Sequence, residues 1–190
     1  MSDSQYSGVS TISGGVYEGI KVEGLCKVKG DLEFTDLEVS GVLRIQGFCK
    51  GETIDISGVI RVLGNVECNT MKVNGSFTGK DIKAEEMTGS IGRTKIGSIF
   101  ADVVSLKTRT RNEIKGIYGE SVSVIEKRKS MLGKKTAVEE IIADEVKLKG
   151  IKVKRIEAKN VELENCSVEE LVYSGTLINK ESFIKTEQKN

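Results

Sequence analysis

Apolar and polar residues alternate along this chain in short segments that end at glycine, and the pattern returns at a fixed step. Residues 39–47 and 56–64 are nearly the same nine-residue string, 17 positions apart, and residues 22–30 and 6–14 fit the same frame. Glycine continues the 17-residue step at Gly24, Gly41, Gly58, Gly75 and Gly92. A fixed period this short is typical of a solenoid built from stacked copies of one unit.

Alternation with a period of two predicts strands that bury one face. Helices are disfavoured because valine and isoleucine are abundant and every segment long enough for a helix contains a glycine, and these residues have low helix propensity. We therefore predict an all-β fold, a parallel β-helix with about 17 residues per coil. Equivalent inward side chains of successive coils then stack about 4.8 Å apart. The columns expected in the core are Leu37/Ile54/Met71, Val39/Ile56/Val73, Leu25/Val42/Val59, Val28/Ile45/Val62, and Leu32/Val66/Ile82/Ile99 with Phe34, Cys68, Ala84 and Ala101.

The repeated glycines are expected at corners, where the backbone takes a positive φ or passes close to the neighbouring coil. Gly58→Val should therefore cost about 1 to 3 kcal/mol of stability through backbone strain.

The second half of the chain shows a different rhythm. Regular coils are predicted over 1–104, and the register is lost over 105–135, which we expect to be an insertion, distorted coils or a projecting hairpin. Apolar residues then recur every five positions from Ile141 to Leu171, so further coils with shorter faces are predicted over 136–185. An amphipathic helix over 156–172 is disfavoured because a step of five moves around a helix. Residues 186–190 form a polar tail that we expect to fray.

The composition agrees with an ordinary soluble protein of 190 residues, 38% hydrophobic and 30% charged. No apolar run approaches the roughly 20 residues that span a bilayer, and no secretory signal is visible. We expect a cytoplasmic protein, with the inner face of the cell membrane as a further location.

Candidate catalytic chemistry is sparse. The chain has no histidine, which removes the commonest general base and metal ligand. The four cysteines match no zinc or redox spacing and occupy apolar positions, so we expect buried, reduced thiols. The acid pair Glu85-Glu86 would point to opposite faces of a strand, and Gly133-Lys134 lacks the first glycine of a phosphate loop. We predict no catalytic residue, metal, cofactor or small-molecule substrate, and no enzyme.

The net charge is +1, but residues 101–135 carry nine basic against four acidic side chains. This stretch is interpreted first as a solvated loop, then as a contact with a membrane surface or a protein, and least as a nucleic-acid contact, because Tyr118 is nearly its only aromatic residue. The candidate surface-contact residues are Arg109, Arg111, Lys127, Arg128 and Lys129.

Two parts of the chain resemble the bactofilins, polymer-forming bacterial cytoskeletal proteins. The likeness is carried by 6–17 and 20–33 at the start, and by 138–146 and 171–177, which are similar to the longer Gram-positive members. The resemblance implies a right-handed, three-sided β-helix that assembles end to end into filaments without nucleotide. It also implies a scaffold for envelope, morphology or motility proteins. The expected partner is a second copy of the chain, and whether a paralogue co-assembles stays open. The basic stretch departs from the family's continuous coil, and no hydrophobic leader is visible for a membrane tether.

Self-assembly also follows from the fold, because a β-helix ends in a coil whose backbone groups and core are uncovered. The candidate interface residues are Tyr6, Val9 and Ile12 at one end and Leu177, Ile178, Phe183 and Ile184 at the other. Two alternatives stay open: the polar tail folds over the last coil as a cap, or the protein is a β-helical adaptor or membrane-surface binding protein that does not polymerise.

Overall fold

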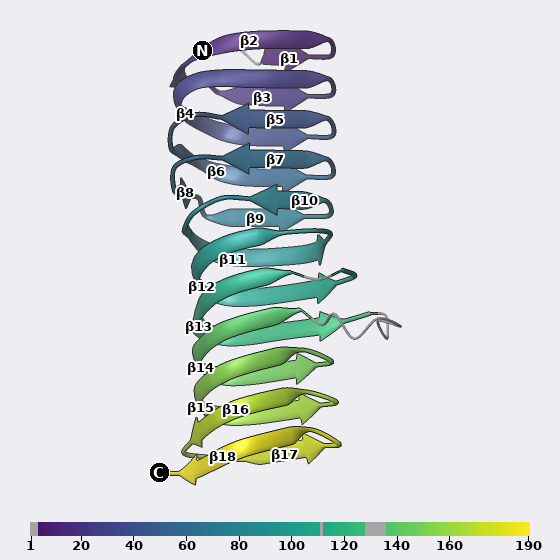
Figure 1. Cartoon of the computed structure of the whole chain (residues 1–190). Coiled ribbons are helices and arrows are strands. Elements are labelled where there is room, and N and C mark those ends of the chain that lie inside the picture. Colours follow the sequence, from purple (N-terminus) through teal and green to yellow (C-terminus); the bar gives the residue numbers. More distant parts are fainter. Residues whose placement is uncertain (1–3, 111, 128–135) are drawn as a thin grey trace.

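The computed structural model describes residues 4–110, 112–127 and 136–190, and this part of the chain consists of strands and bends without a helix. The strands wind into one elongated solenoid with the two termini at opposite ends (Figure 1). They are β1 (Ser4–Tyr6), β2 (Val9–Val16), β3 (Gly19–Val22), β4 (Leu25–Val39), β5 (Val42–Ile45), β6 (Cys49–Ile56), β7 (Val59–Val62), β8 (Val66–Glu67), β9 (Thr70–Val73), β10 (Ser76–Thr78), β11 (Ile82–Ile91), β12 (Lys95–Thr108), β13 (Glu113–Glu126), β14 (Ala137–Lys149), β15 (Lys152–Glu164), β16 (Ser167–Tyr173), β17 (Leu177–Lys180) and β18 (Phe183–Lys189).

Each coil has three faces, which pair separately with the coils on either side. In β4, residues 25–28 pair with β5, residues 32–34 with the start of β6, and residues 36–39 with the end of β6, always in parallel. We call these faces A, B and C, in chain order. Face A holds β2, β5, β7 and β10 and continues in the first residues of β12 to β16 and in β18. The predicted parallel β-helix is confirmed.

The coil length changes along the axis while the pairing stays in register. Face A pairs Leu25 with Val42 and Val42 with Val59, so the chain advances by 17 positions in each of these coils. Lys95 pairs with Glu113, a step of 18, and Glu113 with Ala137, a step of 24. The next two steps are of 15, from Ala137 to Lys152 and from Lys152 to Ser167. Extra residues are therefore accommodated at corners, and the strands stay aligned.

The core is a set of stacked aliphatic columns, as predicted. Leu37, Ile54 and Met71 pair in succession and are each at most 2% exposed. The column that begins at Leu32 and the column that begins at Val28 are buried as well. In the second half, every residue of the five-residue rhythm from Ile141 to Leu171 is buried, because three five-residue faces make one 15-residue coil.

One predicted core column was wrong. Leu25, Val42 and Val59 do stack on one another, but they face outward, and Leu25 and Val59 are 40% and 45% exposed. In the strand that contains Leu25, the side chains of Cys26 and Val28 point into the core. Successive side chains of a strand point to opposite faces, so Leu25 must point to the solvent. Leu25 and Cys26 are both apolar, and alternation alone did not decide which of them is inside.

The basic stretch is only partly irregular. Residues 105–108 and 113–126 belong to β12 and β13, which pair in register with each other and with β14. The glycine rhythm is lost there because the coil step increases to 18 and then to 24, while Val122 and Val124 continue the buried alternation. Residues 111 and 128–135 lie outside the described part. At the end of the chain, residues 186–189 of the tail pair with β16 as part of β18.

The corner glycines are required by close approach between coils. A Cβ on Gly24, Gly41, Gly58 or Gly75 would overlap the carbonyl oxygen of the equivalent glycine one coil earlier. None of these four is among the residues of positive φ, so the alternative explanation by a left-handed backbone does not apply to them.

Candidate assembly surfaces

The two ends of the solenoid present open strand edges. At the first end, β1 pairs only with β3 and β2 only with β4, and at the last end β17 pairs only with β15 and β18 only with β16. Each terminal strand therefore has backbone N–H and C=O groups along one side that no strand of the described chain covers. Such an edge is a template for another strand.

The first coil covers the core with neutral side chains, among them two tyrosines. Tyr6 and Ile12 continue the inward columns of Val22 and Val28, and both pack partly buried against the core. Tyr17 closes the corner, and its hydroxyl donates to the Ser13 carbonyl over 3.1 Å. Burial, followed by the neighbouring Tyr6, raises the pKa of Tyr17 above the ordinary value of a phenol.

The last coil covers the core differently. Leu177 and Ile184 continue the columns of Val161 and Val168 and pack against the core. The other inward positions are polar, because Asn179, Glu187 and Lys189 stand in register with Leu163, Leu171 and Tyr173.

These polar groups partly satisfy one another. The Tyr173 hydroxyl donates to Glu187 Oε1 over 3.0 Å, and this hydrogen bond raises the pKa of Tyr173. Lys189 Nζ lies 5.6 Å from the centre of the Tyr173 ring, a cation–π contact. The two ends thus differ in chemistry: one is neutral, and the other carries charged groups over an apolar rim.

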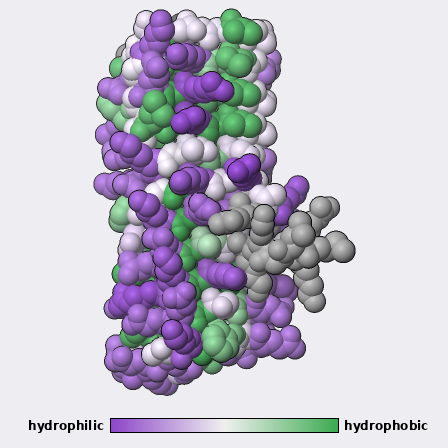
Figure 2. All heavy atoms as spheres, viewed as in Figure 1, coloured by the Kyte–Doolittle hydropathy of each residue, from purple (hydrophilic) through white to green (hydrophobic). Residues whose placement is uncertain are grey.

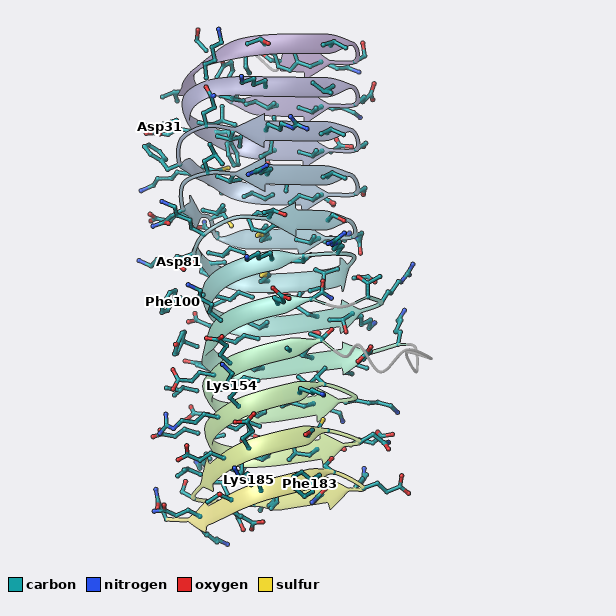
Figure 3. All side chains as sticks on the ribbon, in the orientation of Figure 1. Asp31, Asp81, Phe100, Lys154, Phe183 and Lys185 are labelled. Atoms are coloured by element: carbon teal, nitrogen blue, oxygen red, sulfur yellow. The ribbon has the colours of Figure 1, made fainter. Side chains whose placement is uncertain are left out.

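The seven predicted interface residues divide into two groups. Tyr6, Ile12, Leu177 and Ile184 point into the terminal coils and would meet a molecule stacked on the end. Val9, Ile178 and Phe183 lie in the same coils but point sideways, and Val9 and Phe183 are 86% and 66% exposed. Figure 3 shows Phe183 on the last coil beside Lys185.

Sequence reasoning did not predict Asn179, Glu187 and Lys189 as residues of this end. The sequence contains a signal for them, because these three positions lie 16 residues after the buried residues Leu163, Leu171 and Tyr173, respectively. A search restricted to apolar residues passes over them.

The predicted basic contact is described in part. Arg109 and Lys127 are exposed and lie on adjacent coils, since the Lys127 amide donates to the Thr108 carbonyl over 2.9 Å. Arg111, Arg128 and Lys129 lie outside the described residues. The structure therefore brings together two of the five.

A hollow of about 550 Å³ crosses face A from β12 to β16, and its lining contains an ion pair in which Lys154 Nζ lies 3.3 Å from Glu139 Oε1 (Figure 3). Among the described residues, no group of three metal-ligating side chains comes together, and no helix could cross a bilayer. All four cysteines are buried free thiols, as predicted, and burial raises the pKa of Cys68 to about 12.

Comparisons with family models, with curated proteins and with solved structures found no match to this chain.

Proposed function

We propose that this chain is a structural protein that assembles end to end into filaments without nucleotide, as a cytoskeletal scaffold of the bactofilin type. The observation that carries the proposal is the open strand edge at each end of a solenoid whose inward columns run through its whole length. A coil stacked on either edge would continue the hydrogen-bond ladder, and at the last end it would extend the apolar columns that finish in Leu177 and Ile184. The likeness of 6–33 and 138–177 to bactofilins supports the same function.

Gly8 gives a specific test of stacking at the first end. It occupies the same corner position as Gly24, which lies beneath it, and the Leu25 amide donates to the Gly8 carbonyl just as Val42 donates to Gly24. A Cβ on Gly24 would overlap the Gly8 carbonyl, whereas a Cβ on Gly8 meets no atom of the described residues within 4 Å. Gly8 is therefore free of steric constraint from the coils that the structure describes, and a coil stacked above it would constrain it.

The experiment compares wild type, Gly8→Val and Gly24→Val by negative-stain microscopy and circular dichroism, with no nucleotide added. Wild type should form rods or ribbons many molecules long. Gly8→Val should keep the β-rich spectrum of wild type but form short particles, and Gly24→Val should lose stability even where wild type is dispersed. Wild-type particles of single-molecule length, or Gly8→Val rods as long as those of wild type, would contradict stacking at this end.

The alternative function is a β-helical adaptor that does not polymerise, and the polar last coil favours it. Glu187 accepts a hydrogen bond from Tyr173, and the Lys189 ammonium lies over the Tyr173 ring. Polar side chains placed over the core in this way can cap a terminal coil and prevent another strand from pairing with it. Under either function we place the protein in the cytoplasm or at the inner face of the membrane, with envelope or motility proteins as clients, a paralogue as a further partner, and no catalytic role.

A further inference from the structure

One face of the solenoid carries only basic and neutral side chains over its first half. We call this the basic face: the outward positions of face A from β2 to β10. It has no carboxylate, and none of its cations forms an ion pair within the described part of the chain. Its cations are Lys27, Lys29, Arg44 and Arg61.

The register stacks these cations directly on one another. Lys27 pairs with Arg44 and Arg44 with Arg61, so three like charges follow one another at the spacing of the coils. Like charges directly opposite each other on adjacent strands are destabilising. Two columns of face C avoid this by alternation, because Lys147 Nζ lies 2.8 Å from Glu162 and Lys149 Nζ lies 2.6 Å from Glu164. The basic face lacks such compensation within the molecule.

An exposed apolar column runs beside these cations. Val9, Leu25, Val42 and Val59 stack in register, and Val9, Leu25 and Val59 are 86%, 40% and 45% exposed. Figure 2 shows hydrophobic residues in a vertical row over the first half of the molecule, next to hydrophilic ones. The column ends at Ser76, the next residue in register. A stripe of apolar residues beside cations is typical of a contact surface.

The opposite edge of the molecule is acidic. We call the corner between faces B and C the acidic ridge. Its carboxylates are exposed, belong to successive coils, and have no ion-pair partner among the residues that the structure describes. No cation interrupts the ridge before Lys159, and only the coil of Asn69 lacks a carboxylate. The carboxylates are Glu18, Asp36, Glu52, Glu85, Glu86, Asp102, Glu120 and Asp144.

In a three-sided coil, the corner between two faces lies opposite the third face, so the acidic ridge and the basic face point in opposite directions. Both repeat at the spacing of the coils, about 4.8 Å. We propose that the basic face binds the acidic ridge of a second copy lying parallel and alongside. In that arrangement the same contact can recur on the three successive coils of Lys27, Arg44 and Arg61. A single extended peptide cannot do this, because its successive same-side residues are about 6.8 Å apart.

The arrangement does not close on itself. Because the two surfaces are opposite, each added copy is related to the last by a translation, and the result is an open, flat array of parallel solenoids. The charges set the alignment, and the apolar column loses water at the contact. The contact needs only the solenoid, so it is independent of end-to-end assembly.

Charge exchange tests the proposal. The face variant is Lys27→Glu/Arg44→Glu/Arg61→Glu, and the ridge variant is Glu52→Lys/Glu85→Lys/Asp102→Lys. Each alone opposes like charges, so each should need at least roughly tenfold more protein than wild type to associate laterally at low salt. Mixed one to one, the two variants present complementary surfaces and should associate as wild type does. A control with the same change in net charge as the face variant, Lys50→Glu/Lys83→Glu/Lys107→Glu on faces B and C, should behave as wild type.

Particle width and length in negative stain separate this proposal from end-to-end assembly, because lateral contacts change width and stacking changes length. Narrow rods of normal length for each variant, and wide sheets for the mixture, would support the proposal. It is overturned if the mixture stays narrow, if the control loses width as the variants do, or if wild type is narrow at low salt. Wild type that stays narrow but binds anionic phosphatidylserine vesicles, with binding lost in the face variant, would assign the basic face to a membrane instead.

Discussion

The corner glycines allow a prediction whose magnitude follows from the geometry. At Gly58, a Cβ would overlap the Gly41 carbonyl oxygen and lie 2.5 Å from the Ser40 carbonyl oxygen. An ordinary carbon–oxygen contact is about 3.3 Å or longer, so the two coils must separate by about 1 Å at this corner in Gly58→Ala. No flexible side chain can move aside, because the obstructing atoms belong to the backbone.

That separation breaks hydrogen bonds that join the coils at the corner. The Ser57 and Gly58 amides donate to the Val39 carbonyl over 2.8 and 2.9 Å, and the Val59 amide donates to Gly41 over 2.9 Å. Three bonds at about 1 kcal/mol each give an expected loss of about 3 kcal/mol for Gly58→Ala. This is at the top of the range of about 1 to 3 kcal/mol expected from the sequence, and it arises without a valine side chain.

The assay is urea unfolding followed by circular dichroism, at a protein concentration at which wild type is dispersed. Gly8→Ala is the matched control, because Gly8 has the same corner position with nothing above it, and its free energy of unfolding should stay within about 0.5 kcal/mol of wild type. If Gly58→Ala were as stable as Gly8→Ala, close packing of the coils would not be the reason for the repeated glycine.

Three further predictions concern the core and its borders. Val62→Asp should abolish the β-rich circular dichroism spectrum, because Val62 is 2% exposed and an unpartnered carboxylate there costs several kcal/mol. The Tyr118 hydroxyl and then Arg155 hydrogen-bond Glu140 and hold its pKa below the ordinary 4.5, so this stabilisation is present above pH 4.5 and is lost as the pH falls through the lowered pKa. Urea unfolding should therefore find Glu140→Gln less stable than wild type at pH 7, with a smaller difference at about pH 3; an equal difference at both pH values would refute this. Cys68 and the other three thiols should react with a maleimide at pH 8 only after unfolding, since all are buried and the pKa of Cys68 is about 12; labelling of the folded protein at the rate of a free thiol would contradict the burial.

Much of the fold could be predicted from the sequence because two periods constrain it together. Alternation decides that every second residue faces the core, and the coil step decides which of them stack, as with Leu37, Ile54 and Met71. The five-residue rhythm worked for the same reason, although the coil step had shortened to 15. Neither inference depends on the length or composition of a corner.

The remaining features depend on information that alternation does not contain. Leu25 and Cys26 are adjacent and both apolar, so only the three-dimensional register shows that Leu25 is outside. The polar end residue Lys189 is inward by register and polar by composition, and the two signals conflict. The basic face and the acidic ridge become visible only when positions one coil apart are assigned to the same face.

The variable coil length has a consequence for how such a chain can change over evolutionary time. Coil steps of 15, 16, 17, 18 and 24 coexist in one molecule, and each leaves the pairing of the strands on both sides intact. An insertion or deletion at a corner is thus absorbed where it occurs, whereas one inside a strand would exchange inside for outside in the rest of that strand. Descendants of this protein can be expected to differ in corner length and number of repeats long before they differ in the residues that line the interior.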